Sequence, residues 1–432
     1  MIRRVKSELA GLRGYQGQFW LNFAAMFLYL ASSSFVFPYL GLYMRDTLGI
    51  SLTLVGVVQG VSSFAGMPFQ VLGGLWADRR GRRGVLLLSL LASALLFATL
   101  AVVHALWLVV ALVVAQGALG WPMFLTASNA IVADLVPPER TAEAYGLMRV
   151  AMNAGVIAGP AIAGLALAGG ARFAELFVTA AVGCAALYLL LLLRLRETRP
   201  AGAPNAAIAA GGAAPVAPPG GDETALGAAV DPFVMEPRRG YASVLHDRRF
   251  LALCAVSLLP LFCYGHIVTT LPVYLSTFHG VPASTFGLLI SFNGLLILVA
   301  QYPLIRALQT RDHLLLASVA SALLGVGIGG AALGGQIWWL IVIMMLFTIG
   351  EMIFVPISSS IVAALAPEAA RGRYMGVWSL VWVGGQAVAP TTMGWAMSGL
   401  GRASYLIVVV AGFAGAALFI VLRRVSPGPS PA

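Results

Sequence analysis

One carboxylate lies deep within an apolar stretch of this sequence and is the strongest candidate for acid–base chemistry. Glu351 lies in the middle of the apolar run 337–363, within the sequence Gly-Glu-Met-Ile-Phe-Val-Pro. The other acidic residues fall in polar loops or at the ends of apolar runs. Because a carboxylate at that depth costs about 2.5 to 3.5 kcal/mol to insert into a bilayer, we expect it to be functional and to bind a proton. The alternative is a hydrogen-bonded glutamate that braces two helices.

A second titratable group, His266, lies in the apolar run 250–275 and is a candidate member of a proton relay. A hydrogen-bonded packing histidine is the alternative. The three cysteines also lie in apolar runs, where we expect them to pack and to form no disulfide framework. No metal-ligand spacing and no pairing of a nucleophile with a base is present, so the sequence predicts neither a metal, nor a cofactor, nor an enzyme.

The elements that must position Glu351 are membrane helices. The chain of 432 residues is 60% hydrophobic and 10% charged, and its mean hydropathy is +0.91. One soluble core could not bury so much apolar surface. Runs of about 20 apolar residues span a bilayer, and twelve are present: 18–43, 51–76, 84–103, 106–134, 144–168, 174–194, 250–275, 284–305, 314–334, 337–363, 374–397 and 403–422. The predicted fold class is an all-α membrane protein with twelve transmembrane helices.

The distribution of basic residues predicts the orientation of these helices. If the N-terminus is cytoplasmic, only Arg45, Arg172 and Arg402 fall in loops on the other side, and the remaining loop Lys and Arg lie on the cytoplasmic side. We therefore expect both termini in the cytoplasm of a bacterial cell and the helices in its inner membrane. The net charge of +10 then reflects topology and attraction to anionic lipid, and no nucleic-acid partner is expected. The first run is too long for a cleaved signal peptide.

A segment rich in Ala, Gly and Pro at 200–221 divides the runs into six and six, and we interpret it as a passive linker. The two sides share a repeat at an offset of 230 residues, in which Gly155, Pro160 and Gly164 return as Gly385, Pro390 and Gly394. The same offset pairs Trp121 with Glu351. The predicted organisation is a cytoplasmic segment 1–17, a six-helix bundle 18–194, a cytoplasmic and partly disordered linker 195–249, a second six-helix bundle 250–422 and a cytoplasmic tail 423–432.

The polar loop 74–83, Gly-Leu-Trp-Ala-Asp-Arg-Arg-Gly-Arg-Arg, separates two apolar runs. It resembles the signature loop between the second and third helices of the major facilitator superfamily of secondary transporters. The resemblance implies two pseudo-symmetric bundles that alternate access to a central site. It also implies a gating motif, in which Asp78 caps the eleventh helix near 372–374 and Asp134 pairs with an arginine, most plausibly Arg79. A solvated loop and an ordinary helix-end carboxylate are the alternatives. The motif residues are Gly74, Asp78, Arg79, Gly81, Arg82, Arg83 and Asp134.

The fifth run resembles the glycine-proline motif of antiporters in this family. Its members are Arg149, Asn153, Gly155, Gly159, Pro160 and Gly164. Small residues every four positions let helices approach closely, so simple helix packing is the alternative. We expect Arg149 to reach the membrane surface or to pair with Asp134.

The resemblance also places a substrate cavity between the two bundles. Its candidate residues, besides Asn153, are Tyr29, Gln59, Asn129, Tyr264, Asn293, Trp378, Trp382 and Gln386. Such an aromatic lining with few charges favours a hydrophobic or weakly cationic small molecule. The predicted function is proton-coupled export of hydrophobic or drug-like compounds by a monomer. A metabolite porter, importing or exporting, is the alternative, and a non-transporting membrane sensor is a further one.

Overall fold

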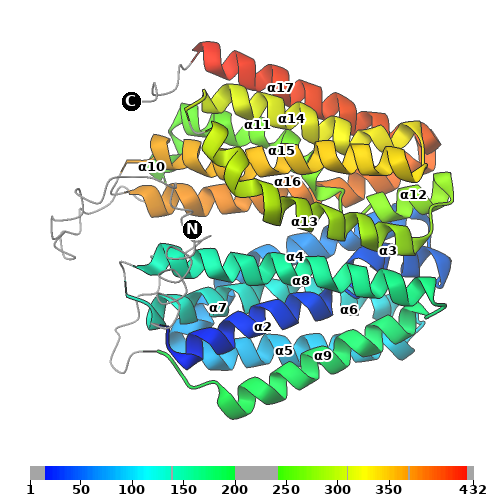
Figure 1. Ribbon diagram of the computed structural model, residues 1–432, viewed down its shortest axis with the longest axis vertical. Coiled ribbons are helices and arrows are strands. Elements are labelled where there is room, and N and C mark those ends of the chain that lie inside the picture. The colour runs from blue at the N-terminus through cyan, green and yellow to red at the C-terminus, as the bar shows by residue number, and fades with distance from the viewer. Residues whose placement is uncertain (1–14, 138–139, 200–241, 309, 368–369, 426–432) are drawn as a thin grey trace, which may run out of the picture.

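The computed structural model describes residues 15–137, 140–199, 242–308, 310–367 and 370–425, and every element within them is helical (Figure 1). The first half of the chain contains α2 (Gly17–Ser33), α3 (Phe37–Asp46), α4 (Leu52–Arg80), α5 (Arg82–Val102), α6 (Leu106–Leu119), α7 (Trp121–Leu135), α8 (Thr141–Ala168) and α9 (Phe173–Arg194). The second half contains α10 (Ala242–Leu245), α11 (Arg248–Gly265), α12 (Leu271–His279), α13 (Ala283–Leu308), α14 (His313–Gly329), η2 (Gly330–Leu333), α15 (Ile337–Leu365), α16 (Arg371–Leu400), η4 (Gly401–Tyr405) and α17 (Leu406–Val425).

The described residues contain 11 helical stretches long and apolar enough to cross a membrane, and one of them, Arg371–Val425, contains both α16 and α17. The structure therefore confirms the prediction of an all-helical membrane fold with twelve spans. The seventh span is made of α11 and α12 together. The proposed linker at 200–221 lies outside the described residues.

Three spans that the hydropathy pattern presents as continuous are broken into two helices each: α2 with α3, α6 with α7, and α11 with α12. In each case the helix after the break has a proline in its first two positions, namely Pro38, Pro122 and Pro272. Proline is tolerated there because the N–H groups of the first helical turn have no partner within the helix, so the N–H that proline lacks is not missed. The breaks thus follow from local chemistry that apolar content does not report.

The helices form two groups, and each group has its own apolar core. Buried residues from Tyr15 to Leu195, joined by Val273, make one core, and buried residues from Val244 to Phe419 make the other. In Figure 1 the helices α2 to α9 lie below the helices α10 to α17. We call them the N-terminal half and the C-terminal half. The halves meet where α4 packs on α16, α8 on α13 and α3 on α12.

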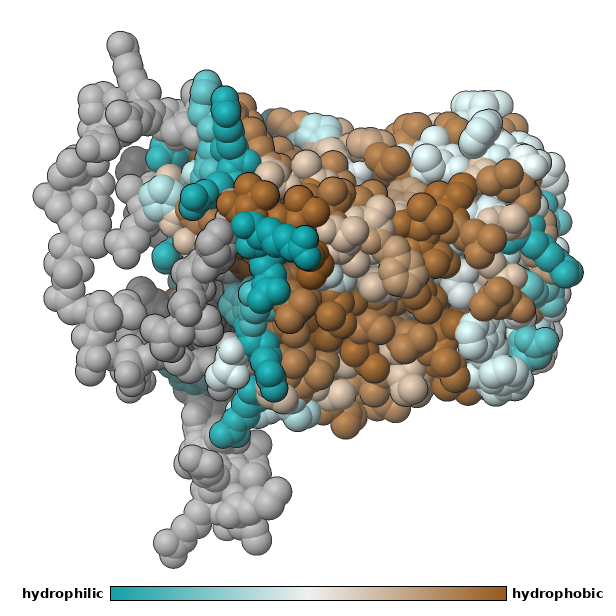
Figure 2. Space-filling view, turned by 90° about the horizontal axis from the view of Figure 1, so that it is seen from above, coloured by the Kyte–Doolittle hydropathy of each residue, from teal (hydrophilic) through white to brown (hydrophobic). Residues whose placement is uncertain are grey.

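The start of α2 and the end of α17 lie at the same end of the bundle, on the left of Figure 1. We call this end the terminal face and the opposite end, which carries α3 and α12, the distal face. Figure 2 shows a broad apolar belt between hydrophilic side chains at the two faces. Large apolar residues such as Leu193, Val410 and Trp395 are exposed in this molecule, each by more than two thirds. This surface is the one that a protein in contact with lipid requires.

Candidate functional site

Glu351 lies on α15 at the centre of a hydrogen-bonded cluster that joins three helices of the C-terminal half. Tyr264 of α11 donates its hydroxyl to Oε1 over 3.0 Å, and Nδ2 of Asn293 on α13 donates to Oε2 over 2.9 Å. The same Nδ2 donates to Oγ1 of Thr348 over 2.9 Å, and Thr348 uses its own hydrogen on the Met344 carbonyl. Because Thr348 must then accept, this network fixes the orientation of the Asn293 amide.

These contacts show which carboxylate oxygen is suited to carry a proton. Nδ2 of Asn293 can only donate, so a proton on Oε2 would weaken that hydrogen bond. The hydroxyl of Tyr264 can rotate and accept, so a proton on Oε1 keeps a partner. Glu351 is half-buried. The cluster can therefore hold an ionised or a protonated carboxylate at one position.

A cluster of aromatic rings adjoins this carboxylate through Tyr264. The ring of Tyr264 lies 5.7 Å from that of Phe347 and 5.7 Å from that of Trp382, measured between centroids. Trp382 in turn stacks with Phe354 at 6.4 Å. Of the predicted cavity residues, Tyr264 and Asn293 thus contact Glu351, and Trp382 contacts Tyr264. A negative charge among aromatic faces suits a cationic or hydrophobic group.

Arg149 of α8 is the cation that the N-terminal half presents to this cluster. Its charge acts on both Glu351 and Tyr264, although no ion pair joins Arg149 to Glu351 within the described residues. The expected pairing of Arg149 with Asp134 was wrong, because the ion pair of Asp134 is made with Arg82. Sequence alone could not reveal this relation, since it depends on how the two halves face each other.

His266 lies apart from the Glu351 cluster. Its Nδ1 is 2.8 Å from Oγ1 of Thr270, which is 3.0 Å from the hydroxyl of Tyr405. The side chain is fully buried against Phe262. Because residues two apart in a helix point to opposite sides, Tyr264 faces Glu351 and His266 faces away. The structure therefore does not place His266 in a relay with Glu351.

The predicted cavity residues outside this cluster have varied environments. Tyr29 is fully buried, stacked on Phe124 at 4.2 Å with its hydroxyl 3.4 Å from Ser93, so its place in the substrate cavity stays a prediction. Gln59, Trp378 and Asn293 are also buried, and Asn129, Asn153 and Gln386 are half-buried.

The glycine-proline motif of α8 packs against two different helices. A Cβ at Gly155 would meet the α2 backbone 2.7 Å away at the Phe27 carbonyl, and Gly159 also faces α2. Gly164 faces the other half instead, where a Cβ would lie 3.3 Å from Cα of Gly287 on α13. The motif therefore holds α8 against its own half and against the C-terminal half at once.

The repeated motif of α16 makes the corresponding contact. A Cβ at Gly394 would lie 2.9 Å from Cα of Gly56 on α4, and a Cβ at Gly56 would lie 2.9 Å from Cα of Gly394. Thr53 joins the same helices through Ser398, with 2.7 Å between the hydroxyl oxygens. Since these residues lie toward the distal ends of their helices, the halves are packed backbone to backbone there.

Arg45, at the end of α3, adds a polar seal at the distal face. Its guanidinium donates to the carbonyl of Val273 over 3.2 Å and to Oγ of Ser276 over 2.9 Å, and it also contacts Thr277. All three partners lie on α12 of the other half. Together with the glycine contacts, this arrangement closes the distal face.

Arg82 organises the signature loop at the terminal face. Its guanidinium reaches Asp78 at 3.0 Å, Asp134 at 3.0 Å and the Ala77 carbonyl at 2.8 Å. The expected partner of Asp134, Arg79, was therefore the wrong arginine. Gly81 connects α4 to α5 at φ 97°, a conformation that other residues rarely adopt.

The segment after α9 contacts this loop and was missed by the sequence analysis. Glu197 accepts hydrogen bonds from the backbone N–H groups of Arg82 and Arg83 over 2.9 and 3.2 Å, and so caps the start of α5. Thr198 donates to Asp134 over 3.1 Å, and Arg199 donates to the Arg79 carbonyl over 2.8 Å. The available signal was a Glu-Thr pair directly after an apolar run, a place where polar loops are common.

The start of α16 has a different partner from the expected one. Tyr374 donates its hydroxyl to Oδ2 of Asp247 over 2.8 Å, and Asp247 also caps α11 through the amides of Arg249 and Phe250. Asp78 is paired with Arg82 instead. The expected contact between Asp78 and the start of α16 is therefore not formed in this conformation.

Twelve apolar spans in two halves, closed at one face and with a half-buried carboxylate in the C-terminal half, define a polytopic membrane transporter. The chain belongs to the Major Facilitator Superfamily, whose model matches residues 23–328 and 279–432. It is 26% identical over 399 residues to a Na(+), Li(+), K(+)/H(+) antiporter of Planococcus maritimus, covering 87% of each chain. It is 27% identical over 403 residues to the multidrug resistance protein MdtH of Cronobacter sakazakii, covering 91% of this chain and 92% of that one.

Solved structures of transporters share the fold. A POT family transporter in complex with 5-aminolevulinic acid superposes with a TM-score of 0.72 at 17% identity, over 95% of this chain and 96% of that chain. A bacterial homolog of the human lysosomal transporter Spinster, in an inward-facing and occupied conformation, superposes with a TM-score of 0.70 at 15% identity, over 96% and 98%. At such identities the likeness concerns the fold alone.

Proposed function

We propose that this protein is a proton-coupled exporter of hydrophobic or weakly cationic small molecules, and that Glu351 is the residue that binds the proton. The observation that supports this most directly is the Glu351 cluster, in which a half-buried carboxylate can change protonation while keeping the Tyr264 hydrogen bond. Two relatives, one named an antiporter that uses protons and one a multidrug resistance protein, agree with this class of activity.

Transport then follows from alternating access between two conformations. The closed distal face and the unengaged contact between Asp78 and α16 support an inward-facing state, if the terminal face is cytoplasmic as the distribution of basic residues predicts. In the opposite state, Asp78 caps the start of α16 and the glycine contacts between the halves open. Substrate and proton favour different states of Glu351, and that difference in binding free energy couples their fluxes. The protein carries its substrate and changes no covalent bond.

The decisive experiment measures two activities in the same proteoliposomes. Glu351→Gln mimics the protonated side chain, so we expect substrate counterflow to persist and pH-driven accumulation to fall at least about tenfold. Glu175→Gln is the matched control, because Glu175 is exposed in an ion pair with Arg172 at the start of α9. Undiminished pH-driven accumulation by Glu351→Gln would remove the proposed role.

Exchange of small cations for protons is the second candidate, because one relative is named a Na(+), Li(+), K(+)/H(+) antiporter. Expression in a host lacking its own exporters separates the two candidates. Resistance to hydrophobic cations without tolerance to sodium or lithium supports the first, and the reverse pattern supports the second. The aromatic rings around Glu351 favour an organic cation, because Na⁺ prefers a shell of oxygen ligands.

A further inference from the structure

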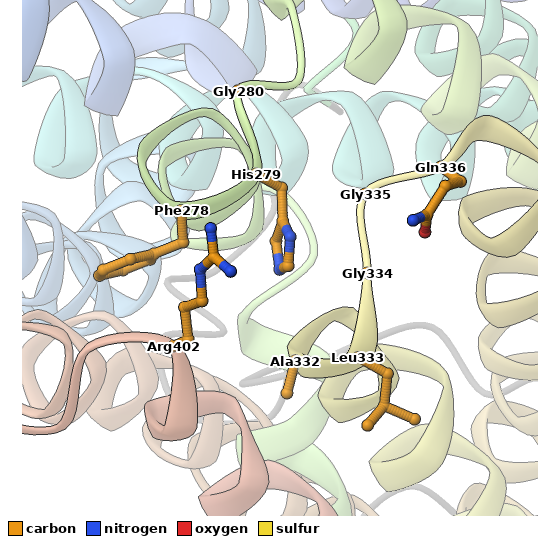
Figure 3. Close-up of a pocket in the computed structure, with 9 residues that line it drawn as sticks. All are labelled: Phe278, His279, Gly280, Ala332, Leu333, Gly334, Gly335, Gln336 and Arg402. Atoms are coloured by element: carbon orange, nitrogen blue, oxygen red, sulfur yellow. The ribbon is translucent and has the colours of Figure 1, made fainter.

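A polar pocket of about 600 Å³ opens at the distal face of the C-terminal half, away from Glu351. It lies between the end of α12, the loop from η2 to α15, and the start of η4. Figure 3 shows Phe278, His279 and Arg402 grouped on one side and the loop segment of Gly334 and Gly335 on the other. None of these loops takes part in the proposed transport site.

Arg402 brings an unpaired positive charge to this pocket. The other two arginines expected at the distal face are neutralised, since Arg45 pairs with Asp46 and Arg172 pairs with Glu175. The guanidinium of Arg402 makes no ion pair or hydrogen bond with any residue that the structure describes. A guanidinium presents a planar set of donors that matches carboxylate and phosphate oxygens.

His279 supplies a second nitrogen beside Arg402. Its Nε2 is buried and has no hydrogen-bond partner in the described structure. A Cβ at Gly335 would lie 2.6 Å from Cβ of His279, so the backbone of this loop packs directly against the histidine. The imidazole is therefore held in place with one nitrogen left to serve a ligand.

No carboxylate lines the pocket, so the charge of its lining residues is positive. We propose that the pocket binds one tetrahedral oxyanion, the phosphate of a phospholipid headgroup or a free inorganic anion, through Arg402 and His279. A cation would be repelled by Arg402, and an apolar ligand would leave both nitrogens without partners.

The rim of the pocket favours the lipid as the source. Leu333 is 74% exposed at the pocket, and Trp338, two residues beyond Gln336, is 63% exposed. Exposed tryptophan next to an apolar rim is typical of the level at which lipid headgroups meet water. A headgroup phosphate could enter the pocket while its acyl chains stay against the apolar belt. Because α12 carries both His279 and the partners of Arg45, the bound anion would brace the sealed distal face.

The site should bind more tightly as the pH falls. Burial, and then the charge of Arg402, lower the pKa of His279 in the empty site. The other titratable group facing its ring in the described structure is Tyr274, 5.7 Å away between centroids, and no acidic side chain faces it there. A bound oxyanion opposes both effects, so it raises the pKa of His279 and is held more strongly by the imidazolium.

The first measurement uses inorganic sulfate, which stays dianionic over the pH range tested. The melting temperature of the detergent-purified full chain is followed against sulfate concentration at constant ionic strength. We expect wild-type binding to tighten about three- to tenfold from about pH 7.5 to about pH 5.5, and to weaken at least about tenfold in Arg402→Gln. His279→Gln should bind sulfate with no pH dependence. Arg172→Gln is the matched control and should bind like wild type.

A second measurement separates the lipid from the free anion. Native mass spectrometry counts the phospholipids retained by wild type, by Arg402→Gln and by Arg402→Lys, which keeps the charge. Loss of one lipid in the Gln variant with rescue in the Lys variant identifies a headgroup as the ligand. Sulfate binding without any difference in retained lipid identifies a free oxyanion. If Arg402→Gln changes neither sulfate binding nor lipid retention, the pocket is not an anion site.

Discussion

In each half of this transporter, a tyrosine of the first span contacts one member of the repeat pair Trp121 and Glu351. The two contacts differ in their chemistry. In the N-terminal half, Tyr29 lies parallel to Trp121 at 6.3 Å within a sealed apolar core. In the C-terminal half, Tyr264 donates a hydrogen bond to Glu351, which the repeat pairs with Trp121. One position thus separates a packing contact from a titratable site. The halves share a fold because their backbone packing is repeated. They differ in function because individual side chains, such as Trp121 and Glu351, differ between the repeats.

A matched pair of tyrosine substitutions tests this comparison with the largest expected effect. Tyr264→Phe removes the partner of Glu351 Oε1, and we expect pH-driven accumulation to fall about tenfold, since a hydrogen bond to a charged group contributes about 1.5 to 3 kcal/mol. Tyr29→Phe removes only a 3.4 Å contact with Ser93 and should lower it less than about twofold. Initial rates in proteoliposomes give both values. Equal losses in the two variants would contradict the assignment of chemistry to the C-terminal half.

The loops at the terminal face differ in the same way, and Asp78→Asn examines the gate. Asp78 pairs with Arg82 here and is proposed to cap α16 in the other state, so its loss shifts the equilibrium between states by about tenfold and lowers flux accordingly. Asp312→Asn, in the counterpart loop of the C-terminal half, should change flux little. Flux is measured at equal expression. Wild-type flux in Asp78→Asn would leave the loop without a gating role.

The symmetric glycine contacts provide a prediction in which the halves behave alike. Gly287→Val and Gly56→Val each place a side chain against backbone of the opposite half, so both should weaken the distal seal and favour the outward-open state by about 1–3 kcal/mol. Gly146→Ala is the control, because a Cβ at Gly146 meets nothing within 4 Å. Labelling of a cysteine introduced between the halves reports opening. Increased opening in only one of the two valine variants would contradict the prediction that the two contacts act alike.

The smallest expected effect concerns pH and Asp312. Partial burial opposes ionisation there, but the amide of Leu315 and the guanidinium of Arg423 outweigh it and lower the pKa of Asp312. A lowered pKa in the folded state contributes stability above the unfolded value, which is lost as pH falls through the folded value. Both side chains are more than one third exposed, so the effect should be small. As the pH falls below about 4, the difference in melting temperature between wild type and Asp312→Asn should narrow slightly. A constant difference down to about pH 2 would contradict this.

Much of the fold followed from the sequence because a bilayer imposes length and apolarity on every span. The twelve spans and the polar loop 74–83 were therefore predictable. The breaks after α2, α6 and α11 were not, since they depend on local proline and turn geometry rather than on apolar content. Glu351 was identified because a carboxylate in lipid is costly wherever it occurs.

The partners of these residues were decided by tertiary structure alone. Sequence proposed Arg79 for Asp134, His266 for a proton relay and Tyr29 as one of the cavity residues. Packing selected Arg82, turned His266 to the far side of α11 and buried Tyr29. Residue type and depth determine the free energy of a buried group, and one sequence contains that information. Which of several nearby groups makes the contact depends on helix rotation and on the conformation of the two halves, and only the assembled structure determines these.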